Sequence, residues 1–205
     1  MTTVSKQAER PRDAQREATA HRILASALRL FDRLGFEHTT VDKIVADAGV
    51  AKGTFFHHFP AKDAILGWIG DQQIRSLESA IASRRGFSQL SFEKQIRFVL
   101  LTLGEAHAER KSLIKFLAAA LLKTDLLSGP HSKGMSQLDA VLLPLIRTAQ
   151  LRGEARAEIP AETMASFIRA MYFHSILEWL QQEDMKFDRV LEPFLQLILR
   201  GTKGD

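Results

Sequence analysis

Apolar residues recur at intervals of three and four along nearly the whole 205-residue chain. Between residues 16 and 34 this spacing forms one apolar stripe on one face of a helix, made of Ile23, Leu24, Ala27, Leu28, Phe31 and Leu34. The strict alternation of apolar and polar residues that marks a half-buried strand does not occur, and neither does an internal repeat. We therefore predict an all-α fold.

Glycine and proline residues mark the ends of the predicted helices, because glycine adopts the left-handed conformation that terminates a helix and proline interrupts its hydrogen bonds. About nine helices are expected. They cover residues 16–34, 40–48, 51–58, 62–85, 91–109, 111–127, 135–152, 161–183 and 188–200. Pro144 is expected to kink its helix, and Pro193 either kinks the last helix or begins it.

The composition limits the classes of protein that the chain can belong to. Hydrophobic residues make up 45% and charged residues 25%, which suits a packed core and argues against overall disorder. The longest apolar runs, such as FLAAALL from Phe116, fall far short of the ~20 residues that a membrane-spanning helix needs. The N-terminus lacks a signal-peptide core, and the chain has no cysteine. We expect a cytoplasmic protein with no membrane partner.

The basic excess of the chain is concentrated in its first third. Residues 1–62 hold 10 Lys and Arg against 7 Asp and Glu, while the net charge of the whole chain is +4. This bias favours a polyanionic partner. The closely spaced Arg10, Arg12, Arg16 and Arg22 form either a solvated terminus or an arm that contacts phosphates or the minor groove.

The segment from Thr40 to Phe59 has the organisation of a helix-turn-helix. A helix, a tight turn that contains Gly49 and a second short helix follow one another, as in proteins whose second helix enters a major groove. Thr39 or Thr40 can cap the first of these helices with its hydroxyl group. The inner face of the second helix is predicted to bury Val50, Phe55 and Phe59.

The other face of this short helix carries residue types that suit contact with DNA. Lys52 can reach a guanine or a phosphate, and Thr54 can bind a base edge or a thymine methyl group. Gly53 has no side chain, so the backbone can approach DNA closely. Lys62 is expected beside the sugar-phosphate backbone. The same face would also present Phe56, His57 and His58.

Residues 22–68, RILASALRLFDRLGFEHTTVDKIVADAGVAKGTFFHHFPAKDAILGW, resemble the DNA-binding domain of the tetracycline-repressor (TetR) family. The resemblance rests on F-x-x-x-G-F, T-T-V-x-x-I and A-G-V-x-K-G-T-F-F-x-H-F-P-x-K-D, whose combined spacing is highly specific. It implies a basic arm over 1–15, a three-helix DNA-binding domain over 16–66 and a helical ligand-binding and dimerisation domain over 67–205.

The resemblance also implies a function. A homodimer would bind a near-palindromic operator in double-stranded DNA and release it when a small-molecule effector enters the C-terminal domain. Thr40 would contact a phosphate at the start of its helix, and Lys62 would clamp the DNA backbone. Lys52, Gly53 and Thr54 would form the base-reading tip, with His57 and His58 at the far end of the recognition helix.

Three positions depart from the family pattern. Phe56 stands where the family commonly has tyrosine, so a hydroxyl contact to phosphate is missing and van der Waals contact must replace it. Ala51 and Ala61 stand where serine often caps the helices, which forgoes ~0.5–2 kcal/mol per cap. We therefore expect a less rigid recognition helix at its expected position.

The effector site is expected among the helices near 91–109, 135–152 and 161–183. Their apolar character favours a hydrophobic or aromatic effector. The candidate lining residues, each of which would otherwise belong to the ordinary core, are Phe98, Leu101, Met135, Phe167, Met171 and His174.

The last two predicted helices are apolar on more than one side. They either close the monomer core or also pair with their twins in a four-helix dimer interface, as the resemblance implies. The candidate interface residues are Ile176, Leu180, Val190, Phe194 and Ile198.

Other chemistries find less support in the sequence. His57 and His58 are adjacent and point apart on a helix, and His174 with Glu178 lacks a further ligand, so no metal, cofactor or catalytic residue is expected. Two alternatives stay open. One is a sequence-indifferent architectural DNA-binding dimer, which should be more basic than +4; the other is an activator without a small-molecule effector.

Overall fold

The computed structural model describes residues 11–108, 111, 114, 115, 118, 132–182 and 184–202. The chain divides into two compact units, of which the first ends at Ile65 and the second begins at Leu66. These described residues form eight α-helices, one short 3-10 helix and no strand, so the prediction of an all-α fold is confirmed. The predicted helix over 111–127 lies largely outside the described residues.

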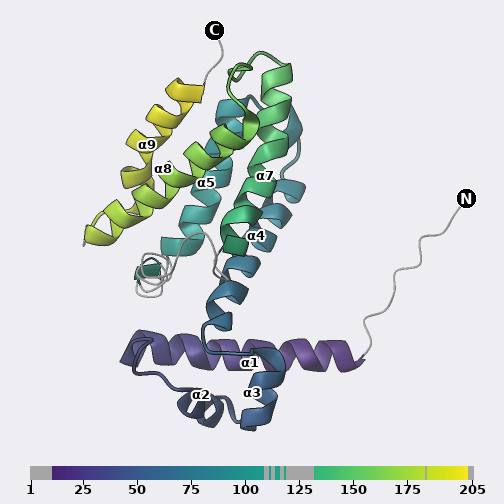
Figure 1. The fold of residues 1–205 in the computed structure, drawn as a ribbon, viewed down its shortest axis with the longest axis vertical. Helices are drawn as coiled ribbons and strands as arrows, with labels where there is room; N and C mark the ends of the chain where they lie inside the picture. The colour runs from purple at the N-terminus through teal and green to yellow at the C-terminus, as the bar shows by residue number, and fades with distance from the viewer. Residues whose placement is uncertain are drawn as a thin grey trace, which may run out of the picture. The chain divides into compact units, whose positions relative to one another are not determined.

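The first unit contains three helices, α1 (Pro11–Leu34), α2 (Val41–Ala48) and α3 (Lys52–His58), and α1 and α3 both pack against α2 (Figure 1). α1 begins earlier than predicted, and residues 11–15 of the predicted arm are helical. Proline suits this position, because the first helical residue has no intrahelical partner for its N–H. The apolar stripe of α1 is buried as predicted at Ile23, Leu24, Ala27 and Phe31, and Leu30 joins them.

The turn between α2 and α3 follows from two residue types that the sequence analysis identified. Gly49 adopts the left-handed conformation with φ 63°, and its N–H closes the end of α2 on carbonyl oxygens of that helix. Two phenylalanines then fix α3: Phe55 is 0% and Phe59 2% exposed. Val50 is only partly buried. Phe55 and Phe59 therefore fix which face of α3 points outward.

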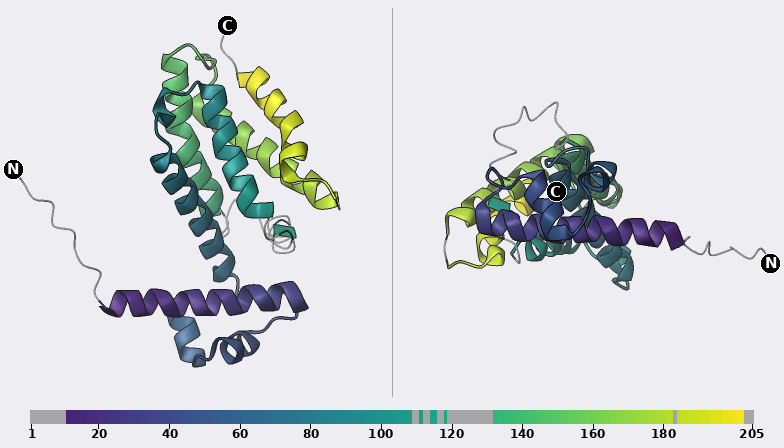
Figure 2. Two further views of the ribbon diagram at one scale, coloured as in Figure 1. Left: turned by 180° about the vertical axis from the view of Figure 1, so that it is seen from behind. Right: turned by 90° about the horizontal axis from the view of Figure 1, so that it is seen from below.

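The second unit is built from α-helices that pack on one another in sequence and across it. α4 (Ala64–Ser83) continues from the first unit, and α5 (Phe92–Ala108), α7 (Ser132–Leu151), α8 (Ala161–Gln181) and α9 (Phe187–Thr202) follow. α8 packs between α7 and α9, and α5 contacts both α7 and α9 (Figures 1 and 2). The apolar faces of these helices share one hydrophobic core.

Two features of this unit differ from the sequence analysis. A 3-10 helix, η1 (Phe87–Gln89), follows Gly86 and inserts the buried Phe87, a turn too short for helical periodicity to reveal. Pro193 lies inside α9, which begins at Phe187, so it does not start the helix.

Gly104 allows a close approach between α5 and α9: a Cβ built there would lie 2.2 Å from the Phe187 ring.

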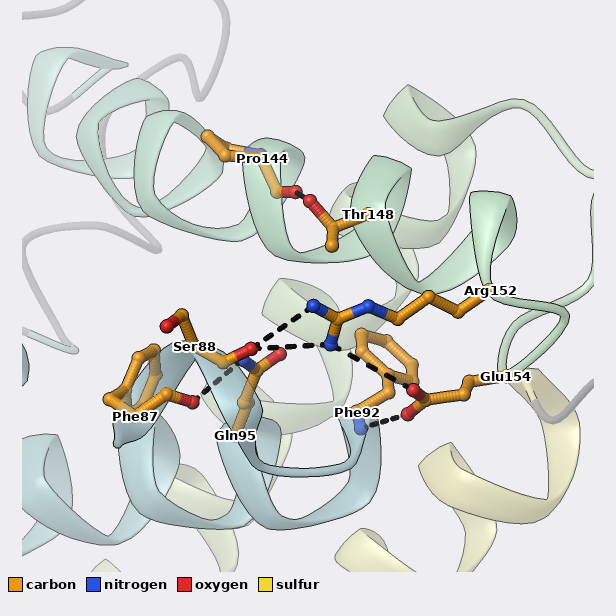
Figure 3. Close-up of polar contacts among 8 residues, drawn as sticks. All are labelled: Phe87, Ser88, Phe92, Gln95, Pro144, Thr148, Arg152 and Glu154. Atoms are coloured by element: carbon orange, nitrogen blue, oxygen red, sulfur yellow. Dashed lines mark hydrogen bonds and ion pairs between the residues drawn. The ribbon is translucent and has the colours of Figure 1, made fainter. Parts of the chain in front are cut away.

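Polar contacts tie α5 to the segment that follows α7. The backbone N–H of Phe92 in the first turn of α5 donates to Oε2 of Glu154 at 2.5 Å, although 62 positions separate them in sequence (Figure 3). Arg152 donates to the carbonyl oxygen of Ser88 at 3.2 Å, and the buried Gln95 donates to that of Phe87 at 2.9 Å. A distant carboxylate therefore caps α5 at its N-terminus, where the helix dipole favours negative charge.

None of the helices among the described residues has both the length and the hydrophobicity that crossing a bilayer requires.

Candidate nucleic-acid interface

The recognition helix α3 exposes most of the residues that the sequence analysis assigned to DNA. Lys52, Gly53 and His57 are exposed, Phe56 is 46% exposed, and Thr54 and His58 are partly buried. A Cβ built on Gly53 would meet no atom within 4 Å, so this end of the helix leaves room for a neighbouring surface. The structure therefore brings the predicted contact residues of α3 together on one short helix.

The two threonines before α2 have different roles. Thr40 is the N-cap, and its hydroxyl oxygen accepts a hydrogen bond from the N–H of Lys43 at 3.3 Å. Thr39 is completely buried and donates to the carbonyl oxygen of Gly35 at 2.8 Å. Thr40 is exposed, so its side chain and the first N–H groups of α2 are the ones available to a phosphate.

The first residue of α3 is already paired with a carboxylate of α2. The Nζ of Lys52 lies 2.7 Å from Oδ1 of Asp42, and both side chains are largely exposed. An exposed pair of this kind contributes little to stability, because solvent screens it. Lys52 can therefore leave Asp42 for DNA at small cost. This role of Asp42 has no signature in the sequence, since spacing alone does not pair residues on two different helices.

A second polar cluster joins α1 to α2. The buried hydroxyl of Ser26 donates to Oδ2 of Asp47 at 2.7 Å, and Arg29 donates to the same oxygen at 2.6 Å. The hydrogen bond from Ser26 is the main reason why the pKa of the Asp47 carboxyl lies below its ordinary value, and Arg29 lowers it further. Ser26 sits in the apolar stripe of α1, where the sequence pattern gave no reason to expect a polar contact.

α3 has no side-chain cap. Its N-cap residue is Ala51, which makes no side-chain hydrogen bond, as its methyl group requires. The helix begins with backbone bonds from Thr54 and Phe55 to the Ala51 carbonyl oxygen, at 2.9 and 3.2 Å. Its position depends on the buried phenylalanines and not on a cap.

His57 and His58 end α3 with their rings edge to face, 5.4 Å apart. Burial lowers the pKa of His58 below its ordinary value, and His57 and Arg16 add to this effect. The His58 ring is therefore mainly neutral at neutral pH in the free protein, and it can offer a phosphate a neutral N–H donor. Within the part of the chain that the structure describes, no three His, Cys, Asp or Glu side chains gather to hold a metal ion.

Lys62 lies in a different environment from the one that the sequence analysis expected. Its Nζ donates to the carbonyl oxygens of Phe36 at 2.7 Å and Thr39 at 3.0 Å, both in the loop between α1 and α2. The ammonium group also lies 3.9 Å from the centre of the Phe36 ring. In the free protein this side chain is directed at its own unit.

The predicted effector residues are not equivalent in the structure. Phe98, Leu101 and Met171 are partly buried against the core of the second unit. Phe167 is 41% exposed and His174 is exposed, so neither lines the interior of the single chain. The side chain of Met135 lies outside the described residues. α8 is apolar on nearly every side, so its sequence pattern does not identify which of its residues face the interior of the single chain.

The predicted dimer residues divide in a similar way. Ile176, Val190 and Ile198 are buried in the core of the single chain and close it, whereas Leu180 and Phe194 are partly exposed. The outer surface of α8 and α9 instead carries Phe167 and Leu197, the latter 60% exposed. The apolar pattern of α9 does not separate core positions from interface positions, because both are apolar.

The first unit, α1 to α3, is a reading head whose α2 and α3 form a helix-turn-helix with a buried aromatic side and an exposed basic and polar side. Together with the helices of the second unit, it defines a helix-turn-helix DNA-binding protein. Residues 23–67 match the family model described as "Bacterial regulatory proteins, tetR family". These residues form a DNA-binding domain of the TetR type, and the relatives and solved structures named below support a TetR-family transcriptional regulator. It is a DNA-binding transcriptional regulator, and the relatives named below are described as transcriptional regulators.

Relatives of known class extend the similarity beyond the reading head. The HTH-type transcriptional regulator EthR of Mycolicibacterium smegmatis is 27% identical over 194 residues, covering 89% of this chain and 86% of the relative. Thermus thermophilus FadR, solved in complex with lauroyl-CoA, is 27% identical with a TM-score of 0.72, covering 89% and 94% of the two chains. Bacillus subtilis FadR, solved with stearoyl-CoA, shares the fold at 17% identity and a TM-score of 0.73, covering 88% and 98%.

Proposed function

We propose that the protein is a homodimeric repressor that binds a near-palindromic operator and releases it when an acyl-CoA thioester binds its second unit. The observation that carries the proposal is the exposed face of α3, held outward by the buried Phe55 and Phe59. In a two-fold dimer the two α3 helices would enter major grooves one helical turn apart, ~34 Å from centre to centre. Such a dimer is expected to act in the cytoplasm and to have no enzymatic activity.

The residues of α2 and α3 would share the work of binding. Thr40 and the first N–H groups of α2 would hold a phosphate, and His58 would hold another, which sets the register of the protein on DNA. Lys52 and Thr54 would distinguish bases, after Lys52 exchanges Asp42 for a guanine or a phosphate. Phe56 would contribute van der Waals contact from its exposed ring.

The effector class is inferred from similarity and from one polar feature of the second unit. Thermus thermophilus FadR, at 27% identity, was solved with lauroyl-CoA, and an acyl chain suits the apolar helices of this unit. Among them, Gln137 of α7 donates to Oδ1 of Asp71 in α4 at 3.0 Å, yet its buried Oε1 has no hydrogen-bond partner among the described residues. Such an oxygen is costly unless a donor reaches it. The pantetheine part of CoA carries amide N–H donors of the required kind.

DNA selection tests the first part of the proposal. Random duplexes captured by the purified protein should yield a two-fold symmetric motif, and Thr54→Val should relax the preference at one position in each half-site by ~1–3 kcal/mol. Thr19→Val is a matched control, since Thr19 lies on α1 and its hydroxyl donates to the carbonyl oxygen of Gln15. A wild-type protein that retains all duplexes equally would contradict the proposal and favour an architectural role.

Ligand titration tests the second part. Lauroyl-CoA should raise the melting temperature of the protein and weaken its operator binding, and free CoA should do neither at the same concentration. If lauroyl-CoA stabilises the protein without weakening operator binding, the effector would not act by release, and the activator hypothesis would gain support.

A further inference from the structure

We propose that Lys62 is a positioning residue that holds the loop between α1 and α2, and does not itself clamp the DNA backbone. The inference rests on the proposed function, because it concerns how the same reading head presents α2 to a phosphate. It departs from the role that the family resemblance implies for this lysine. The geometry of three groups supports it.

The Lys62 ammonium group is already occupied in the free protein. Two of its N–H bonds are used by the carbonyl oxygens of Phe36 and Thr39, at 2.7 and 3.0 Å. The Phe36 ring lies beneath it at 3.9 Å, and the ring itself is buried against Phe31. Only the third N–H is left for a phosphate, so a lysine that turned its whole ammonium group to the DNA backbone would break two hydrogen bonds to carbonyl oxygens, which carry the partial negative charge that a lysine seeks. This differs from Lys52, whose exposed partner is easily replaced.

The loop that Lys62 holds ends at the N-terminus of α2. The carbonyl oxygen of Thr39 belongs to the residue directly before the N-cap, Thr40. Thr39 is fixed in turn by its buried hydroxyl, which donates to Gly35, and by its N–H, which donates to Phe36 at 3.1 Å. Lys62 therefore completes a network that fixes where Thr40 and the first N–H groups of α2 point. These are the groups through which α2 would bind a phosphate.

Salt dependence separates a positioning lysine from a clamping one. Each phosphate neutralised by a cation contributes about 0.9 to the slope of log affinity against log salt concentration. Lys62→Met should weaken operator binding about tenfold while leaving this slope unchanged, because it displaces neutral groups of α2 from their phosphate and removes no cation from the DNA. Lys52→Met should lower the slope, and Lys94→Met, an exposed lysine of the second unit, should change neither quantity.

Lysine ammonium NMR provides a second measurement, which is made on the wild-type protein and uses a variant only to assign the signal. The Lys62 ammonium signal, assigned from the Lys62→Arg variant, should be visible in the free wild-type protein, since hydrogen bonds to two carbonyl oxygens slow its proton exchange. It should keep its position when operator DNA is added. The Lys52 signal should shift on addition of the same DNA.

The outcomes distinguish this inference from the proposed function. If Lys62→Met lowers the salt slope by about 0.9, or if the Lys62 signal moves as far as that of Lys52 when DNA binds, then Lys62 contacts phosphate and the inference is wrong. Unchanged operator affinity in Lys62→Met would also overturn it. A wild-type protein without any preferred duplex would instead remove the proposed function on which the inference rests.

Discussion

The reading head and the second unit hold their helices in place by different means. In the head, polar contacts of loop and helix ends supplement a small core: Ser26 with Asp47, Thr39 with Gly35, and Lys62 with two carbonyl oxygens. In the second unit an apolar core dominates, with polar ties that span long stretches of sequence, such as Phe92 with Glu154. The head is therefore specified locally, whereas the second unit is specified by residues far apart in the chain.

The largest expected effect is in the core of the head. Phe55→Ala removes a ring that is completely buried, and a substitution of this kind costs ~3–5 kcal/mol. A head of three helices has little further core to compensate, so α3 should lose its position and operator binding should disappear. Circular dichroism and gel shifts on the same sample measure this.

The control for Phe55→Ala is Phe56→Ala, which truncates the neighbouring ring on the exposed side. Its melting temperature should stay close to that of the wild type, while its operator affinity falls modestly. If the two variants were destabilised equally, the division of α3 into a buried and an exposed face would be wrong.

In the second unit the largest expected effect comes from adding an atom. Gly104→Ala places a methyl group where the Phe187 ring lies, 2.2 Å away, and both residues are buried. Overpacking of this kind costs ~1–3 kcal/mol. We expect a lower unfolding free energy in urea, and Phe187→Leu in the same chain should recover part of the loss. If the Gly104→Ala variant were as stable as the wild type, the packing of α5 against α9 would adjust to the added methyl group without loss of stability, contrary to this prediction.

The contrast between the two units also explains what the sequence could reveal. The ends of the two helices of the helix-turn-helix were predictable to within one or two residues. Thr40 caps the start of α2, Gly49 ends it, and Pro60 prevents α3 from continuing. The roles of Ser26 and Asp42 were not predictable, since they depend on which side chains of separate helices come within 3 Å of each other.

In the second unit the sequence predicted that helices exist but not which faces meet. α8 is apolar on nearly all sides, so its pattern does not separate Ile176, which is buried in the single chain, from Phe167 and His174, which are exposed. A carboxylate that caps a helix from 62 positions away, as Glu154 does, leaves no local pattern. Hydrophobic periodicity locates a buried face only when the opposite face is polar.

A smaller effect tests whether a polar group of the second unit has a use. Gln137→Leu removes the unpartnered Oε1 along with the hydrogen bond to Asp71, so the stability of the free protein should change by less than ~1 kcal/mol. If Oε1 accepts from the effector, lauroyl-CoA should bind about fivefold to tenfold more weakly, the value of one hydrogen bond. Isothermal titration with Gln181→Leu, an exposed glutamine of α8, as control measures this. Equal affinities would exclude Gln137 from effector binding.

The smallest effect concerns the ion pair between α5 and α9. In the second unit this pair corresponds to the polar contacts that hold the helices of the head. Arg97 binds both carboxylate oxygens of Glu192, at 2.5 and 2.9 Å, and this lowers the pKa of Glu192 from 4.5 to about 2. Because the folded pKa is below the unfolded one, the pair stabilises the fold above about pH 4.5, and this contribution is lost as the pH falls toward 2.

The partly exposed position of the pair limits its value to ~0.5–1 kcal/mol. Glu192→Gln should therefore lower the unfolding free energy by that amount at pH 7, and the difference from the wild type should shrink steadily between pH 4.5 and pH 2 in urea titrations. A deficit that persists unchanged at pH 2 would mean that Glu192 acts through packing and not through charge. This contact between α5 and α9 would then position the two helices through packing, unlike the charged and hydrogen-bonded contacts of the head.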